Sequence, residues 1–398
     1  MALVSLARAI RQSWRVAPHA MGARPLARGA STTIEFGQLR QNACNGDWVC
    51  FATGRSNRPI QTSVVQEGFR TTQGIAHDAN CPFCFGNEPL SGASLLEVPG
   101  GGDPWSLRIV ANKYPAVKMP SDWKAVERSR QERGSKFRNN VVLDNVLDAV
   151  GSHEVVIETP LHNSVLALGD LARVERLVRA WRDRGRELIH DNSWVHHVLY
   201  FKNQGTVGGA SLLHPHSQLV ALPIVPEHVQ RSQDHAFQWF TEHNQSVWGR
   251  MLEEELDLMA CSPGQHRIVD SNDEFVALVP FAALSPYSMW IVPRRDSAHF
   301  DETSDASLAA FAELLHRCLR RLHVCLKEPD FNLLIRSAPV ANRSRQRAFN
   351  ASTYYRWHAT LFPRMGAGAM AGFEFASGIF SNSNWPEDDA EKLRRVEI

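Results

Sequence analysis

The sequence predicts an α+β protein made of two tandem units, each a mainly antiparallel sheet with crossing helices. At 398 residues the chain is long enough to bury two cores. An ordered set of strand-like and helix-like segments occurs twice, and a polar stretch rich in helix formers separates the two sets. We place an N-terminal domain at 32–224 and a C-terminal domain at 225–398, after a targeting segment at 1–31.

The first unit begins with two strand-like stretches, RIVANKYPAV (108–117) and GSHEVVIETP (151–160). A helix over about 171–191 follows, because apolar residues recur there at the spacing of one buried stripe. The members of that stripe are Val174, Leu177, Val178, Trp181 and Leu188. The unit ends with the strand HHVLYFKNQG (196–205) and the segment SLLHPHSQLVALP (211–223).

The second unit repeats this order after a connecting helix or helical pair over 227–261. Its strands are RIVDSNDEFVALVP (267–280), MWIVPRR (289–295), FNLLIRSAP (331–339) and YYRWHATLFP (354–363). Its helix, over about 307–327, has a stripe of Leu308, Phe311, Leu315, Leu319 and Leu322.

The prolines that end the two units, Pro223 and Pro363, offer one alignment of the repeat. Counting back from them, His358 falls opposite Gln218, and Arg356 falls opposite His216. On this alignment only the first unit keeps a histidine at the position of His216. We therefore expect chemistry in the first unit and substrate contacts in the second.

Charge is balanced along most of the chain, with 43 Lys plus Arg against 42 Asp plus Glu. This balance argues against a nucleic-acid partner or an anionic membrane surface. No stretch approaches the roughly 20 apolar residues of a membrane span. The N-terminus is the exception, because five arginines precede the first acidic residue, Glu35: Arg8, Arg11, Arg15, Arg24 and Arg28. This pattern is typical of a mitochondrial transit peptide, and a disordered basic tail on a cytoplasmic protein is the alternative.

The cysteine pair in CPFC, Cys81 and Cys84, has a spacing suited to tetrahedral zinc. Seven cysteines in a long chain without a secretory signal argue against a disulfide framework. No second CxxC is present, so further ligands are sought among histidines, with His153 and His214 offered by two strands. A reduced, metal-free pair beside core histidines is the alternative.

His214 and His216 are separated only by Pro215, and in a strand they point to the same face. Pro215 has no N–H to donate, which confines the segment to a sheet edge or a bulge. Both imidazoles are able to bind one metal. Alternatively, one is held by zinc while the other stays neutral and nucleophilic near pH 7.

The loop NQGTVGGAS, just upstream, contains Gly205, Gly208 and Gly209 and ends at Ser211. Glycines let backbone N–H groups approach an anion closely, and Ser211 and Gln218 add polar side chains near the histidines. A loop of this kind is also typical of a plain flexible turn. Beside a candidate nucleophile, however, it favours phosphoryl chemistry.

Taken together, CPFC, GSHEVVIETP, FKNQGTVGGASLLHPHSQ and GFEFASG followed by WPED resemble the galactose-1-phosphate uridylyltransferase family, within the histidine-triad superfold. The resemblance runs from about residue 34 to the C-terminus. It implies one structural zinc on Cys81, Cys84, His153 and His214. It also implies that His216 is the nucleophile, with Gln218 as a second catalytic residue, and that the enzyme is a ping-pong nucleotidyltransferase forming a nucleotidyl-histidine.

Substrates and partners follow from the same resemblance. The donor is a nucleotide sugar, the acceptor is hexose 1-phosphate or inorganic phosphate, and the protein is a homodimer. The implied substrate-binding residues are Arg55, Arg58, Asn112, Asn203, Gly209, Ala210, Ser211, Leu212, Gln218, Phe373 and Glu374. Of these, Phe373 and Glu374 face the sugar.

Two departures from the family pattern concern the substrate and a second metal. Bacterial members carry a second metal site that ends in His-Ala-His, whereas this chain has His358-Ala359-Thr360, and Arg336 replaces another of its histidines. We therefore expect no second metal. The SQ after His216 and the C-terminal motif resemble the plant-type ADP-glucose phosphorylase branch, which favours adenylyl over uridylyl transfer. A histidine-triad hydrolase and a non-catalytic zinc-stabilised module are the competing hypotheses.

Overall fold

The computed structural model describes residues 37–52, 74–101, 105–119, 121, 123–124, 148–262, 264–340, 350–365 and 372–398. The expected targeting segment at 1–31 and the residues Arg55 and Arg58 lie outside these ranges. Within the described part, the chain from Gly37 to Ile398 forms one compact unit. No helix of that part is long and apolar enough to cross a membrane.

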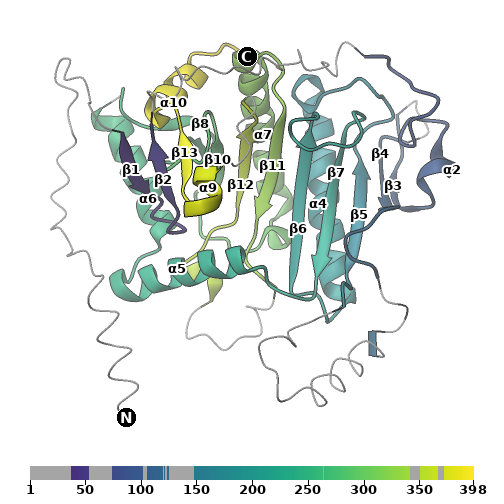
Figure 1. Ribbon diagram of the computed structural model, residues 1–398, viewed down its shortest axis with the longest axis horizontal. Coiled ribbons are helices and arrows are strands. Elements are labelled where there is room, and N and C mark those ends of the chain that lie inside the picture. Colours follow the sequence, from purple (N-terminus) through teal and green to yellow (C-terminus); the bar gives the residue numbers. More distant parts are fainter. Residues whose placement is uncertain are drawn as a thin grey trace. The chain divides into compact units, whose positions relative to one another are not determined.

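The main feature is a ten-stranded sheet in the order β3-β4-β5-β7-β6-β11-β12-β10-β9-β8 (Figure 1). Its first-half strands are β3 (Ser94–Val98), β4 (Leu107–Ala111), β5 (Ser152–Ile157), β6 (His197–Gln204) and β7 (His216–Leu222). Its second-half strands are β8 (Ile268–Ser271), β9 (Phe275–Leu278), β10 (Met289–Pro293), β11 (Phe331–Arg336) and β12 (His358–Pro363). All the pairings in this sheet are antiparallel, so the predicted α+β class is confirmed.

The two halves share this sheet instead of forming two separate ones. Strand β6 pairs with β11, with Phe201 opposite Leu334, and the strand order on either side of this pair is mirrored. The expected boundary near residue 225 falls between β7 and the connecting helices α5 (Glu227–His243) and α6 (Val247–Cys261). A site in one half is therefore joined to the other half by ladder hydrogen bonds.

Helices α4 (Leu171–Asp191) and α7 (Asp305–Leu326) cover one face of the sheet (Figure 1). Asp170 and Ser304 cap them, each side chain accepting a hydrogen bond from a first-turn backbone N–H. Both predicted stripes are buried in the main hydrophobic core between these helices and the strands. Gly185 allows α4 to approach β6, because a Cβ there would lie 1.9 Å from the hydroxyl of Tyr200.

The opposite face carries smaller elements. Helices α5 and α6 pack there in a second core that includes Trp248, Trp290 and Tyr355. A three-stranded sheet is built from β1 (Gln38–Gln41), β2 (Trp48–Phe51) and β13 (Phe380–Asn382). The short helices α2 (Glu88–Ser91) and α9 (Gly372–Ser377), the C-terminal α10 (Pro386–Arg394) and the 3-10 helices η3 (Leu166–Leu168), η4 (Phe300–Glu302) and η5 (Ala351–Thr353) complete the described elements.

Backbone geometry aligns the two halves differently from the prolines. His216 Nδ1 donates to the carbonyl oxygen of His214, and His358 Nδ1 donates to that of Arg356, two residues back in each case. Arg336 pairs with His358 on β11, and Asn203 falls level with His216 when the β6–β7 register, Phe201 with Gln218, is continued. His358 is thus the counterpart of His216, and the alignment by prolines is wrong by two residues.

Candidate metal centre and nucleophile

Four side chains converge beside the strands of the first half: Cys81, Cys84, His162 and His214. Their ligand atoms all lie within 4.8 Å of one another, and three of the four residues are buried. The CPFC turn supplies both sulfurs, with the Cys84 N–H donating to the carbonyl of Cys81. His162 follows β5, and His214 immediately precedes β7.

Distances within this cluster fit a tetrahedral zinc. Cys84 Sγ lies 3.5 Å from His162 Nδ1 and 3.6 Å from His214 Nδ1. Zinc bonds of about 2.3 Å to sulfur and about 2.0 Å to nitrogen imply sulfur–nitrogen edges of about 3.5 Å in a tetrahedron. His214 Nε2 donates to the carbonyl of Thr159 at 2.8 Å, which leaves Nδ1 with its lone pair toward the other ligands.

The protonation states of the cluster are compatible with a bound cation. Burial raises the pKa of the Cys81 thiol to about 11, and burial lowers the pKa of His214 to about 3. Without a metal, both groups are therefore neutral near pH 7. A bound Zn²⁺ would hold the sulfurs as thiolates and use the imidazole in its neutral form.

His153, which the sequence suggested as a ligand, lies elsewhere, and that assignment is wrong. His153 pairs with Val220 on β7, six residues from His214, and a strand rises about 3.3 Å per residue. The histidine that joins the cluster is His162, in the turn after the same strand. The apolar sequence of β5 favoured His153 at the start of the strand, whereas the metal ligand, His162, lies beyond the end of the strand.

His216 and His214 have opposite tautomers. His216 Nδ1 donates to the carbonyl of His214 at 2.8 Å, so Nε2 carries the lone pair. His216 is 6% exposed, and burial lowers the pKa of its imidazole, with the charge of Lys202 acting in the same direction. The ring of Phe83 lies 5.3 Å from that of His216 and 6.0 Å from that of His214. Position, tautomer and charge state therefore suit His216 Nε2 as a nucleophile.

A buried ion pair lies behind the nucleophile. Lys202 Nζ donates to both carboxylate oxygens of Glu158 at 3.0 Å and to the carbonyl of His216 at 3.2 Å. Both side chains are fully buried on the face of the sheet that α4 covers. Because β5, β6 and β7 all take part, the pair fixes the backbone from which His216 projects.

We expect Lys202→Met to lower the free energy of unfolding by about 3 kcal/mol or more, because Glu158 would be left as an uncompensated buried carboxylate. Urea unfolding measures this loss, and Lys202→Met combined with Glu158→Leu should recover much of it. The matched control is Arg250→Met at the exposed pair with Glu254, which should change stability by less than about 0.5 kcal/mol. Wild-type stability in the Lys202→Met protein would contradict the structural role of the pair.

Three polar side chains, His153, Gln218 and Asn112, lie together on the same face as His216, and His153 is hydrogen-bonded to Gln218. His153 Nε2 is 2.7 Å from Gln218 Oε1 and 3.0 Å from Asn112 Nδ2, and His153 Nδ1 accepts from the backbone N–H of Ala116. Because Nδ1 accepts, Nε2 carries the proton and donates to Gln218. His153 thus orients Gln218 and lies against Asn112, two residues that the sequence assigned to catalysis and substrate.

The Gly-rich loop between β6 and β7 is held by the second half of the chain. Asn332 Nδ2 donates to the carbonyl of Gly208 at 2.6 Å and to Asn203 Oδ1 at 2.9 Å. Asp330 accepts from the backbone N–H of Val207 at 2.7 Å. Gly205 has a φ of +73°, and a Cβ there would lie 1.8 Å from Asp330 Oδ1, so both conformation and space require glycine.

The structure brings only part of the expected substrate set together. Asn203, Gly209 and Gln218 lie on β6, the loop and β7 around His216, and Ala210, Ser211 and Leu212 continue the loop. Leu212 packs against the apolar cluster that contains both cysteines. Phe373 and Glu374 lie on α9 beside β13, a strand of the smaller sheet.

Several supporting residues were not identified from the sequence: Phe83, Glu158, His162, Lys202, Asp330 and Asn332. Phe83 and His162 were detectable in principle, because both lie within or next to quoted motifs. The partners from β11 act only through the pairing of β6 with β11, which no local pattern reveals.

Comparisons with known proteins agree with this geometry. The model of the galactose-1-phosphate uridyl transferase N-terminal domain matches residues 30–226. An ADP-glucose phosphorylase from Arabidopsis thaliana is 28% identical over 93% of this chain and 96% of its own. A galactose-1-phosphate uridylyltransferase from Thermotoga maritima is also 28% identical, over 91% and 99%.

Solved structures extend the similarity to the fold. The crystal structure of an ADP-glucose phosphorylase from Arabidopsis thaliana with bound ADP-glucose covers 92% of this chain and 100% of that chain, at a TM-score of 0.72 and 26% identity. A uridylyltransferase structure covers 89% and 97% at a TM-score of 0.62 and 23% identity, and it supports the fold alone.

Proposed function

Since the chain belongs to the galactose-1-phosphate uridylyltransferase family, we propose that it transfers the adenylyl group of ADP-glucose to inorganic phosphate. The coarser activity, a nucleotidyltransferase that uses a histidine nucleophile on nucleotide sugars, follows from the family. The choice of ADP-glucose rests on one observation, the similarity over 92% of the chain to a phosphorylase that holds ADP-glucose.

In the first step, His216 Nε2 attacks the α-phosphorus in line with the bond to the bridging oxygen. The P–N bond forms, the P–O bond breaks, and the electron pair leaves on glucose 1-phosphate, which needs little protonation. Positioning and fixed donors carry most of the catalysis in such transfers. Nδ1–H stays bonded to the His214 carbonyl and supports the positive charge that develops on the ring.

In the second step, an oxygen of inorganic phosphate attacks the same phosphorus, releasing ADP and free His216. Gln218, oriented by His153, is placed to donate its amide to a phosphoryl oxygen. The backbone N–H groups of the Gly-rich loop, held by Asp330 and Asn332, offer further donors. A zinc ion on Cys81, Cys84, His162 and His214 would supply rigidity, because it would tie the CPFC turn to the segment after β5 and the segment before β7.

Uridylyl transfer from UDP-glucose to a hexose 1-phosphate is the second candidate function. The 28% identity to the Thermotoga maritima enzyme over 91% of the chain favours it. Both candidates use the same nucleophile and the same covalent chemistry. They differ in the base of the donor and in the acceptor.

Incubation with base-labelled ADP-glucose or UDP-glucose, without any acceptor, distinguishes the two. We expect adenine label on the protein at close to one per chain, and its release as ADP when phosphate is added. Uracil label that is discharged only by a hexose 1-phosphate would overturn the adenylyl proposal. Steady release of free nucleoside monophosphate without an acceptor would instead identify a hydrolase.

We propose a homodimer and mitochondrial import as secondary features. Phe373 and Glu374 lie on α9, beside the smaller sheet, so a second copy is a reasonable recipient for these sugar-side residues. Light scattering should give twice the 44.6 kDa of one chain. The five arginines before Glu35 support import, which uptake by isolated mitochondria tests.

A further inference from the structure

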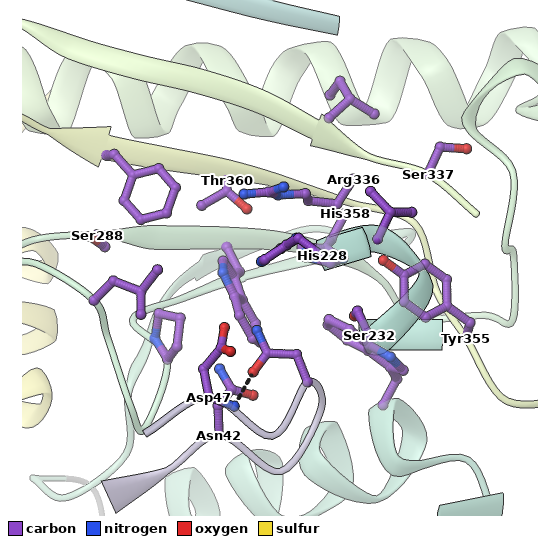
Figure 2. Close-up of a pocket in the computed structure, with 18 of the residues that line it drawn as sticks. Asn42, Asp47, His228, Ser232, Ser288, Arg336, Ser337, Tyr355, His358 and Thr360 are labelled. Carbon is purple, nitrogen blue, oxygen red and sulfur yellow. Dashed lines mark hydrogen bonds between the residues drawn. The ribbon is translucent and has the colours of Figure 1, made fainter. Parts of the chain in front are cut away.

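A pocket lies in the second half of the sheet, at the position that corresponds to the His216 site (Figure 2). His358 and Thr360 of β12, Arg336 of β11, and His228 and Ser232 of α5 are among the residues that line it. Because Trp357 and Ala359 face the main core, His358 points to the other face of the sheet, as His216 does. The same strand geometry thus places a histidine on this face of the sheet in each half.

Arg336 is the central polar feature of this pocket. Within the part of the chain that the structure describes, its guanidinium has no hydrogen bond and no ion pair, and burial lowers the pKa of Arg336. Among the described lining residues it is the one Lys or Arg. Arg336 is half-buried, and a guanidinium partly withdrawn from water without a partner is costly, a cost that an anion bound beside it reduces.

The remaining charges do not neutralise Arg336. Asp47 also lines the pocket and its charge favours the Arg336 cation, but its carboxylate is shared with Arg231, to which it is paired at 2.9 Å. His197, His228 and His358 are neutral near pH 7, because burial lowers the pKa of each. The pocket and its immediate partners therefore carry a net charge of about +1, which favours an anionic ligand.

Further donors and the size of the pocket restrict the ligand. Trp248 and His197 line the pocket, and within the described part of the chain the buried Trp248 Nε1 and His197 Nδ1 have no hydrogen-bond partner. The hydroxyls of Tyr355 and Thr360 add two more polar groups. The cavity volume is about 60 Å³. One water needs about 10–15 Å³, so the space suits roughly four to six waters or one tetrahedral oxyanion.

We propose that this pocket binds a phosphate group on Arg336, at a site separate from the one that contains His216. The two sites are related by the repeat, with Arg336 at the counterpart of Asn203 and His358 at the counterpart of His216. The fork of the guanidinium suits two oxygens of one phosphate. The proposal stands independently of which nucleotide sugar the enzyme uses.

Equilibrium dialysis of the zinc-loaded full chain against radiolabelled inorganic phosphate tests the proposal. We expect Arg336→Met to bind one phosphate fewer per chain than the wild type. Asn203→Ala, altered in the His216 site, should keep that phosphate. Arg250→Met, altered at an exposed surface pair, is the matched control and should bind as the wild type does. Equal phosphate stoichiometry in Arg336→Met and the wild type overturns the proposal.

A second variant and a displacement measurement extend this test. If Arg336→Met does not fold, Arg336→Lys is the second variant. It keeps the positive charge but lacks the two parallel N–H donors of a guanidinium, and it should bind phosphate at least about tenfold more weakly than the wild type. Unchanged affinity in that variant also overturns the proposal. In the Asn203→Ala protein, displacement by glucose 1-phosphate identifies the phosphoryl group of a sugar phosphate as the ligand, and no displacement identifies free phosphate.

Zinc analysis covers the alternative that this pocket holds a cation. The proposal expects the same zinc content in His358→Gln as in the wild type. A second zinc per chain in the wild type that disappears in His358→Gln would make this a metal site and overturn the proposal.

Discussion

Replacing His216 with glycine should abolish covalent labelling by the nucleotide sugar and lower kcat by at least about 10³-fold. The variant removes Nε2 of His216, the ring nitrogen that carries the lone pair. Nδ1–H is committed to the His214 carbonyl, which leaves the lone pair on Nε2 for the attack. Mass spectrometry of the intact chain after incubation with the donor measures the loss of label directly.

His358→Gln is the matched control, because His358 makes the same hydrogen bond to the carbonyl two residues back on the counterpart strand. It should keep the covalent label. His216→Gly should also keep its zinc and its melting temperature within a few degrees, since His216 is outside the metal cluster. Label that persists in folded His216→Gly would show that another residue is the nucleophile.

Much of the fold was predictable because it depends on local periodicity. The stripes of α4 and α7 and the apolar runs of β5, β6, β11 and β12 each identify an element without knowledge of its partners. The sharing of one sheet by the two halves was not predictable, because it depends on β6 pairing with β11 across about 130 residues. Neither strand shows which edge it will present.

The residues of the site also fall into those that local sequence motifs predict and those that depend on the three-dimensional arrangement of the strands. Cys81, Cys84, His214 and His216 were identified because their spacing within short motifs is itself the chemical signal. His153 was assigned to the metal because it lies in an apolar strand, but a strand places its residues about 3.3 Å apart along a line, and only one end of β5 reaches the cysteines. The prolines gave a wrong alignment of the halves for a similar reason, since they mark where strands end and not which carbonyl the histidine contacts.

Replacing His162 tests the metal cluster. His162→Ala should weaken zinc binding by at least about 100-fold and lower the melting temperature, because a structural zinc contributes its binding energy to folding. His153→Ala should keep close to one zinc per chain and instead lower kcat, by about tenfold or more, because Gln218 loses the N–H that orients its side chain. Zinc analysis after dialysis and steady-state kinetics separate the two effects.

The pair of variants is informative because the two histidines belong to one stretch of chain: His153 lies at the start of β5, and His162 follows its end. Cys81→Ser should behave like His162→Ala, since both remove a member of the cluster at the same end of β5. The opposite pattern, with zinc lost in His153→Ala and kept in His162→Ala, would return His153 to the metal and contradict the placement of both histidines. His153 contacts Gln218 and therefore acts on the positioning of the substrate. His162 faces Cys84 and therefore acts on the stability of the fold. The two roles are thus separated along one strand and the turn that follows it.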